Sequence, residues 1–417
     1  MAVVPGRFAA VLLVLVAAIW IATPALAVDP LPAVNDPAYV AGLQWNLDAI
    51  GAPAAWRASI GAGVVVAVVD SGVDRGHPDL AGQVVGEVSC IGANGDPQRC
   101  QGTAADDDGH GTHVAGIIAA RANDGVGIAG VAPGARVLAV RALADTCGDP
   151  TRCHPTGATT DIAAGIRWSV EHGARVVNLS LGTTTQLGAD IRAAAREAWR
   201  RGVITVLAAG NGRGPSDLAG EPIVVVTATD RSGLRSVYAN PVGAFRWGLA
   251  APGGADGDTP DTCRLGGAPL GIFSTYWRGT ADGSGYACEA GTSMAAPQVS
   301  GGLALLLAMG FTPSGAIARL QATARPSQPT GGEPELGAGL IDLARAVSPP
   351  YPPGVRVQAA GLARARPARP PETGPLGVSA PRPNLPSWWF VAGGGLSTAA
   401  ATDLVWRWTQ RRRARRA

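Results

Sequence analysis

The run VVVAVVDSGVD occupies residues 64–74 and decides the fold class. Its first six residues are apolar, without alternation of apolar and polar positions. This pattern is typical of a strand in a parallel sheet, because both faces of such a sheet are covered. Asp70 follows the strand directly, which places its carboxylate at the edge where these sheets bind ligands. Taken alone, Asp70 fits a turn or a helix cap more readily than a functional group.

Similar apolar runs alternate with Ala-rich stretches through the middle of the chain. The predicted strands are Val64–Val69, Arg136–Ala142, Arg175–Ser180, Val203–Ala208 and Ile223–Ala228, and the helices between them include Asp161–His172 and Asp190–Arg201. Strands that alternate with helices predict a doubly wound α/β domain, a parallel sheet with helices on both faces. The content of 47% hydrophobic residues is enough for a large core and excludes a wholly disordered chain.

A histidine motif, DGHGTHVAG, follows at residues 108–116 and leads into an apolar helix. It places His110 at the start of that helix, with a glycine on each side. His110 and His113 are three residues apart, a spacing that suggests a metal pair. The motif lacks the glutamate and the four-residue spacing of H-E-x-x-H zinc sites, however. The histidine that does no chemistry is predicted to be a packed, hydrogen-bonded residue of the helix.

A serine motif, GTSMAAP, occupies residues 291–297 and precedes a predicted helix over Val299–Met309. Ser293 is therefore predicted near a helix N-terminus, where backbone N–H groups and the helix dipole favour negative charge. The competing interpretation is that Ser293 or Thr292 only caps the helix.

Considered together, these motifs occur in the order Asp, His, Ser, which is the subtilisin order. They closely resemble the motifs of the subtilisin-like serine proteases (subtilases, peptidase family S8) over about Trp45 to Val347. The resemblance implies a subtilisin-like doubly wound sheet and a serine endopeptidase (EC 3.4.21) that cleaves a polypeptide substrate through an acyl-enzyme. It also implies a catalytic triad of Asp70, His110 and Ser293, with His110 as the base.

The same resemblance assigns two further segments. In the run AAGNG at residues 208–212, Asn211 would donate its side-chain amide to the oxyanion, beside the backbone N–H of Ser293. The alternative for Asn211 is a turn-forming Asn-Gly. Ser180, Leu181 and Gly182 resemble the segment that pairs with an extended substrate backbone.

No cofactor and no metal ligand are predicted. Calcium is common in secreted subtilases, and Asp106, Asp107 and Asp108 form an acidic run. A solvated acidic turn near His110 is the preferred interpretation of this run.

The two ends of the chain predict that the protein is located outside the cytoplasm. Arg7, the apolar run after it and Ala25-Leu26-Ala27 resemble a secretory signal, for which a retained membrane anchor is the alternative. Trp388 to Trp408 is mostly apolar with Trp at both ends, and an Arg-rich tail follows. These features predict a single span with a cytoplasmic tail and a catalytic domain outside the plasma membrane. An interfacial amphipathic segment and a nucleic-acid-binding tail are the alternatives. Asp403 and the run of three glycines at 393–395 weaken the prediction of a span.

The predicted organisation is a signal peptide (1–27), an N-terminal extension (28–44), a peptidase domain (45–347), a Pro-rich linker (348–387), a transmembrane helix (388–408) and a basic cytoplasmic tail (409–417). The six cysteines fall in neighbouring pairs, Cys90 with Cys100, Cys147 with Cys153 and Cys263 with Cys288. Disulfides between these neighbours are expected in an oxidising compartment. A net charge of +3 is too small to predict a nucleic-acid partner.

Signal peptide, linker, span and Arg tail in this combination resemble the mycosins, the membrane-anchored proteases of mycobacterial type VII secretion systems. This resemblance implies the type VII secretion membrane complex as a partner. Two alternatives stay open: a mainly structural or stabilising subunit of that complex, and a general degradative subtilase.

Overall fold

The computed structural model describes residues 34–355, except 145–154, 183–186, 213–217, 219, 244, 258–262, 264–267, 278–284 and 327–334. The predicted signal peptide, most of the linker, the C-terminal span and the basic tail lie outside the described residues, as do Cys147 and Cys153. In the part of the chain that is described, no single helix is long and apolar enough to cross a bilayer. Within the described ranges, one pair of helices, α7 (Thr292–Ala308) and α8 (Pro313–Thr323), reaches that length and composition together, and a bend of 120° separates them.

A seven-stranded sheet forms the centre of the domain, and every strand pair in it is parallel. Its strands, in the spatial order β2-β3-β1-β4-β5-β6-β7, are β2 (Val84–Ser89), β3 (Arg136–Arg141), β1 (Val65–Asp70), β4 (Val176–Leu179), β5 (Ile204–Ala208), β6 (Ile223–Thr229) and β7 (Gly248–Pro252). An antiparallel pair, β8 (Ile272–Thr275) and β9 (Tyr286–Glu289), lies beside it. The central strands are buried along their whole length, as their continuous apolar runs predict.

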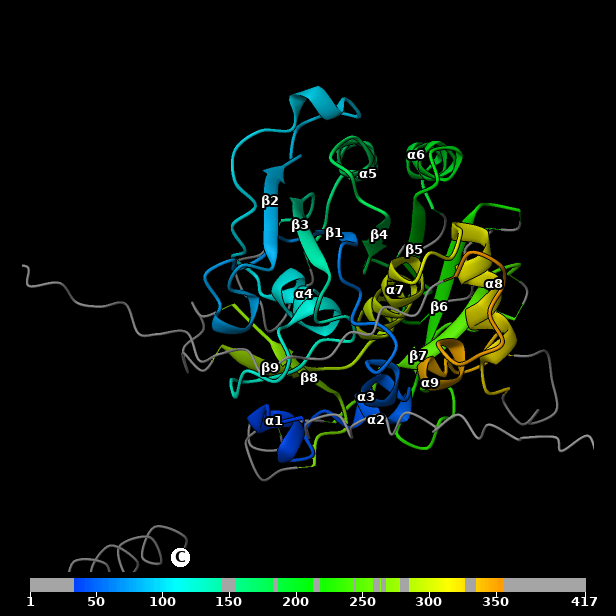
Figure 1. Cartoon of the computed structure of the whole chain (residues 1–417). Coiled ribbons are helices and arrows are strands. Elements are labelled where there is room, and N and C mark those ends of the chain that lie inside the picture. Colours follow the sequence, from blue (N-terminus) through cyan, green and yellow to red (C-terminus); the bar gives the residue numbers. More distant parts are fainter. Residues whose placement is uncertain are drawn as a thin grey trace, which may run out of the picture. The chain divides into compact units, whose positions relative to one another are not determined.

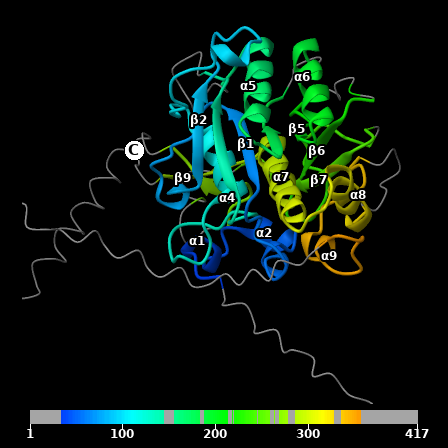
Figure 2. The same ribbon diagram turned by 45° about the horizontal axis from the view of Figure 1, so that its top comes forward.

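Helices cover the sheet in two layers (Figures 1 and 2). The remaining helices are α1 (Pro37–Val40), α2 (Trp45–Ala49), α3 (Ala52–Ala55), α4 (His110–Ala119), α5 (Thr159–Glu171), α6 (Ala189–Arg200) and α9 (Leu343–Ala346). α5 and α6 pack together on one face, and α4 and α7 pack together on the other. The predicted α/β fold is therefore confirmed, and the five predicted strands agree with the observed ones to within two residues.

Not every element was predicted. In the edge strand β2, Val88 is buried and the other positions are partly or fully exposed, and the strand contains Gly86 and Glu87. β7 contains both Gly248 and Pro252, so neither strand shows a continuous apolar run. The strand order reverses at β1, with β2 and β3 on one side and β4 to β7 on the other. β1, β4 and β5 are thus neighbours, and the segments that follow them meet at one edge of the sheet.

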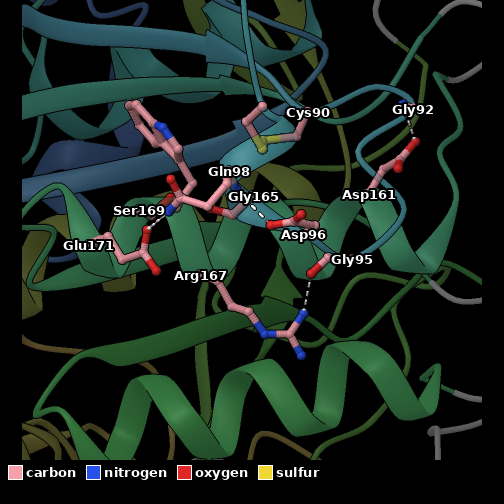
Figure 3. Close-up of a disulfide and its surroundings, with 12 residues drawn as sticks. Cys90, Gly92, Gly95, Asp96, Gln98, Asp161, Gly165, Arg167, Ser169 and Glu171 are labelled. Atoms are coloured by element: carbon pink, nitrogen blue, oxygen red, sulfur yellow. Dashed lines mark hydrogen bonds between the residues drawn. A yellow bond between two sulfur atoms is a disulfide. The ribbon is translucent and has the colours of Figure 1, made fainter.

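Two of the three expected disulfides are present, between Cys90 and Cys100 and between Cys263 and Cys288. The first closes the loop 90–100, which lies against α5 (Figure 3). The Asp161 carboxylate accepts hydrogen bonds from the backbone N–H of Gly92 and of Asn94, both at 2.8 Å. Arg167 donates to the carbonyl of Gly95 at 2.9 Å. The stretch from Gly92 to Gly95 is therefore fastened to α5 by three hydrogen bonds, so the loop does not depend on the disulfide alone.

Two buried carboxylates, Asp36 and Asp79, lie near α1 and the loop that precedes β3. The Tyr286 hydroxyl donates to Asp79 at 2.9 Å and the backbone N–H of Ile128 donates at 3.1 Å. One oxygen of each carboxylate has no hydrogen-bond partner among the described residues. Burial, opposed by the hydrogen bonds and reinforced by the nearby Asp124, raises the pKa of Asp79 to about 7 and that of Asp36 to about 6.

A raised carboxyl pKa in the folded state makes stability depend on pH. Between about pH 4 and about pH 7, folded Asp79 holds a proton that the unfolded chain has lost, so the free energy of unfolding falls as the pH rises through this range. Asp79→Asn removes the ionisable group and should flatten that slope in urea denaturation of the full chain with EDTA present. Asp107→Asn, at a half-exposed carboxylate, is the control. An unchanged slope in Asp79→Asn would contradict the assignment.

Candidate active site

The best-defined contact of the predicted site joins Asp70 to His110. Asp70 is the last residue of β1 and is fully buried, while His110 is the first residue of α4. The distance from His110 Nδ1 to Asp70 Oδ1 is 2.7 Å, and the backbone N–H of Ser71 donates to the same oxygen at 2.8 Å. An ionised carboxylate only accepts hydrogen bonds, so Nδ1 carries the proton and Nε2 is left as the basic nitrogen.

This approach of α4 to β1 requires the glycines beside His110. A Cβ on Gly111 would lie 2.1 Å from the carbonyl oxygen of Gly72. A Cβ on Gly109 would lie 2.4 Å from the Tyr276 ring, and Gly109 has φ of +113°, in the left-handed region. Gly111 is therefore explained by the close packing that brings His110 to Asp70, and Gly109 by its left-handed backbone and its contact with Tyr276.

The Asp70 carboxylate sets the protonation of His110. Burial by itself lowers the pKa of a histidine, but the charge of Asp70 and its hydrogen bond outweigh burial here, and Glu289 and Asp108 act in the same direction. The result is a His110 pKa above its ordinary value of 6.5. The site therefore stabilises an imidazolium, the form that a general base takes after it has accepted a proton.

His113 has a structural place in the fold. It is fully buried, and its Nε2 lies 3.0 Å from the carbonyl oxygen of Ile272 in β8. Burial, together with the charge of His110, lowers the pKa of His113 to about 3, so the ring is neutral. Since a carbonyl only accepts, Nε2 carries the proton and ties α4 to β8, as expected for the histidine that does no chemistry.

The acidic run before His110 differs from its prediction. Asp106 and Asp108 are buried rather than solvated, so the interpretation of a solvated acidic turn is wrong for both. Asp106 accepts from the Ser71 hydroxyl and from the N–H groups of Asp108, Gly109 and Thr112. Asp108 accepts from the backbone N–H of His110 at 3.1 Å. These bonds stabilise the turn that begins α4, and only Asp107 is exposed, where it pairs with Arg141.

Ser293 is the second residue of α7. The N-cap position is Gly291, so the interpretation of Ser293 or Thr292 as the cap is wrong. The Ser293 hydroxyl donates to the backbone carbonyl of Ser180 at 3.1 Å, and the Ser180 hydroxyl donates to the Ser293 carbonyl at 2.7 Å. The segment after β4 is thereby held against the N-terminus of α7. No hydrogen bond joins Ser293 to His110 among the described residues.

Asn211 follows β5 and reaches the same helix terminus. Its Oδ1 accepts from the backbone N–H and from the hydroxyl of Thr292, both at 3.0 Å. The Thr292 hydroxyl also accepts from the N–H of Gly210 at 3.0 Å. With its oxygen held twice, Asn211 keeps its side-chain N–H₂ available as a donor.

Two residues near the site were missed from the sequence. Thr292 positions Asn211, but beside Ser293 it was interpreted only as a possible cap. Glu289, at the end of β9, has its Oε2 3.9 Å from His113 Nδ1 and interacts electrostatically with His110. No sequence signal marks Glu289, because its neighbours on α4 are distant in the chain. The described residues contain no group of three or more His, Cys, Asp or Glu that could hold a metal ion.

Segments after β1, β4 and β5 and the first turns of α4 and α7 thus converge. They bring together a buried acid with its imidazole, a hydroxyl at a helix N-terminus, and an amide donor. These are the groups that acyl transfer needs: a nucleophile, a general base, a residue that orients the base, and donors for an oxyanion. Leu181 and Gly182 follow Ser180, and a Cβ on Gly182 would be in van der Waals contact with Gly210, which follows β5.

Comparison with known proteins agrees with this geometry. Residues 61–339 match the Subtilase family, peptidase S8. The chain is 36% identical over 300 residues to thermitase of Thermoactinomyces vulgaris, which covers 71% of this chain and 93% of thermitase. It is also 36% identical over 281 residues to a thermophilic serine proteinase of Bacillus sp. strain AK1, covering 65% of this chain and 59% of that relative. A solved protease structure from Pseudoalteromonas arctica PAMC 21717 superposes with a TM-score of 0.61 at 30% identity. The match covers 76% of this chain and 99% of that one.

The two histidines of α4 are expected to titrate at opposite extremes. Histidine-selective NMR of the full chain should show His110 titrating above its ordinary pKa of 6.5 and His113 staying neutral down to about pH 4. Asp70→Asn removes the charge that raises the pKa of His110, so burial should then lower that pKa below 6.5. A His110 titration that is unaffected by Asp70→Asn would show that the carboxylate does not control the ring.

Proposed function

The chain belongs to the subtilase family and is a serine endopeptidase, and we propose that Asp70, His110 and Ser293 are its catalytic triad. The observation that carries this proposal is the 2.7 Å contact between His110 Nδ1 and the buried Asp70 carboxylate. That contact leaves His110 Nε2 as the base, and Ser293 is a hydroxyl at the N-terminus of a buried helix. Polypeptide is the substrate.

The proton moves between Ser293 and His110. The Ser293 hydroxyl turns from the Ser180 carbonyl toward His110, loses its proton to Nε2 and attacks the peptide carbonyl. Asp70 holds the ring in the required tautomer and stabilises the imidazolium. His110 then gives the proton to the leaving amine, and water hydrolyses the acyl-enzyme by the same route. Only neutral His110 accepts a proton, so activity rises with pH through its raised pKa.

The oxyanion of the tetrahedral intermediate is stabilised at the start of α7. Asn211 donates its side-chain amide and Ser293 donates its backbone N–H, while the helix dipole adds positive potential. Support comes from Thr292, which fixes Asn211 Oδ1 through two hydrogen bonds. Ser180, Leu181 and Gly182 pair with the extended backbone of the substrate, because they continue β4 past the edge of the sheet.

The location of the enzyme is a further part of the proposal. We infer a protease held at the outer face of the plasma membrane, with residues 388–408 as its span and 409–417 in the cytoplasm. The support is the apolar segment with Trp at both ends, followed by an Arg-rich tail. Together with the resemblance to mycosins, this arrangement favours a role beside a type VII secretion membrane complex.

Two substitutions test the chemistry. Ser293→Ala should abolish both peptide hydrolysis and labelling by a fluorophosphonate probe, because the nucleophile is gone. Asn211→Ala should keep a folded protein and lower turnover by about 10²–10³, a value measured for one oxyanion donor in subtilisin, a relative. The measurements are peptide hydrolysis, probe labelling and circular dichroism. More than half of the activity remaining in Asn211→Ala would reject its role.

Truncation tests the location. The full chain should be labelled by the probe in the membrane fraction, and deletion of residues 388–417 should move the label to the soluble fraction, since the proposed span is lost. Complementation of a deletion strain of the source organism then tests the secretion role. Restored secretion with wild type but not with Ser293→Ala is expected if proteolysis is required, and restoration by both would show a structural role. Full-length protein in the soluble fraction would contradict the anchor.

A further inference from the structure

Glu289 is an acidic residue beside the site with no part in the mechanism above. It ends β9, pairs in register with Ile272 of β8, and lies four positions before Ser293. The neighbouring Cys288 is linked to Cys263 by a disulfide, which holds this strand in place. The Glu289 side chain is 24% exposed, so the carboxylate is mostly buried but is still accessible to solvent.

The other acidic side chains around His110 already have hydrogen-bond or ion-pair partners. Asp70 is bonded to His110, Asp106 accepts from several donors, and Asp108 accepts from the backbone of His110. Asp107 pairs with Arg141 at 2.8 Å. Among the described residues, the one basic group within 4 Å of the Glu289 carboxylate is His113, whose Nδ1 lies 3.9 Å away and beyond hydrogen-bond distance. Asp70 and Asp108 each keep one oxygen without a hydrogen-bond partner among the described residues, but both side chains are buried. Glu289 is therefore the partly exposed acid of this group that accepts no hydrogen bond from the described residues.

His113 does not neutralise Glu289. Its ring is neutral, with its proton on the nitrogen that faces β8, and its Nδ1 has no hydrogen-bond partner among the described residues. Among the described residues, the charged groups that act most strongly on Glu289 are His110 on α4, Asp70 on β1, and Asp106 and Asp108 before α4, and none of them is an arginine. Tyr276, after β8, is the other titratable neighbour and carries no charge while protonated. The potential on this side of His110 is negative.

The position of Glu289 relative to the two halves of the substrate follows from the chemistry. Ser180 to Gly182 hold the acyl half, through the segment that is bonded to Ser293. His110 protonates the leaving amine, so the other half of the substrate departs on the His110 side. Glu289 lies on that side, because its carboxylate interacts electrostatically with His110 and lies near His113, one turn further along α4.

We propose that Glu289 is a specificity-determining residue that selects polypeptides with an arginine or lysine directly after the cleaved bond. This inference rests on the proposed function, since it assigns a substrate class to the same site. The long cationic side chain of an arginine or lysine can reach the partly buried Glu289 carboxylate while the substrate backbone stays at His110. A partly exposed pair of this kind is expected to change the rate by about fivefold.

The preference should depend on pH. Burial raises the pKa of Glu289 to about 7; the charge of His110 opposes burial, and the neighbouring aspartates reinforce it. Glu289 is therefore largely neutral at about pH 5.5 and ionised at about pH 8. The preference for a cation is expected to grow as the pH rises through this range. Both substrates are cleaved with the same base, His110. The ratio of their kcat/KM values at one pH is therefore unaffected by the titration of His110.

The experiment compares two internally quenched peptides that differ only after the cleaved bond, one with arginine and the other with its neutral isostere citrulline. Their remaining sequence comes from a cleavage site mapped by digestion of a peptide library with the full chain. For the wild type, kcat/KM should favour arginine about fivefold near pH 8, and the ratio should approach one near pH 5.5. This pair tests the proposal without any variant.

Variants then assign the effect to Glu289. Glu289→Gln should bring the ratio to about one at both pH values, Glu289→Arg should favour citrulline, and Glu289→Asp should retain part of the preference. Glu171→Gln, which makes the same charge change on α5, is the control and should behave as wild type. Fluorophosphonate labelling reports on Ser293 separately in each protein.

The outcomes separate the two proposals. A wild type that is labelled and cleaves both peptides equally near pH 8 overturns the role of Glu289 and leaves the triad intact. The same holds if Glu289→Gln is labelled normally and keeps the arginine preference. A wild type that is neither labelled nor active refutes the proposed triad, and the inference about Glu289 falls with it. If Glu289 had a structural role alone, its substitution would change kcat/KM for both peptides and leave the ratio of the two values unaltered.

Discussion

The hydrogen bond between His110 and the buried Asp70 is the contact on which the geometry of the site depends. It requires α4 to approach the end of β1 so closely that Gly111 has no room for a side chain, while the Tyr276 ring leaves none at Gly109. Asp106 and Asp108 hold the turn before the helix, and His113 ties the helix to β8. These contacts together place the His110 imidazole against the Asp70 carboxylate.

The electrostatics of the site follow from this arrangement. Several carboxylates surround one imidazole, and each except Glu289 accepts at least one hydrogen bond or forms an ion pair. Their charge raises the pKa of His110 and gives the surrounding surface a negative potential. The feature that makes His110 a stronger base therefore also favours a cationic substrate beside it, so reactivity and selectivity have one physical origin.

The fold was predictable because its signals are local. A strand covered on both faces is apolar at most of its positions, as in β1, β5 and β6, and such runs can be recognised in the sequence. β2 and β7 were missed for the same reason, since an edge strand and a strand with glycine and proline lack that pattern. The burial of Asp106 was missed because its partners, Ser71 and Thr112, meet it only after folding.

The sequence by itself determined the α/β class, the position of Asp70 at the end of a strand, and His110 and Ser293 near the starts of helices. These depend on residues within a few positions of each other, and so does the pairing of neighbouring cysteines. Only the tertiary structure decided that His113 is a neutral structural residue, that Thr292 holds Asn211, and that Glu289 acts on His110. These contacts join β9 to α4 and the end of β5 to the start of α7, and a contact between distant segments leaves no periodic pattern in either one.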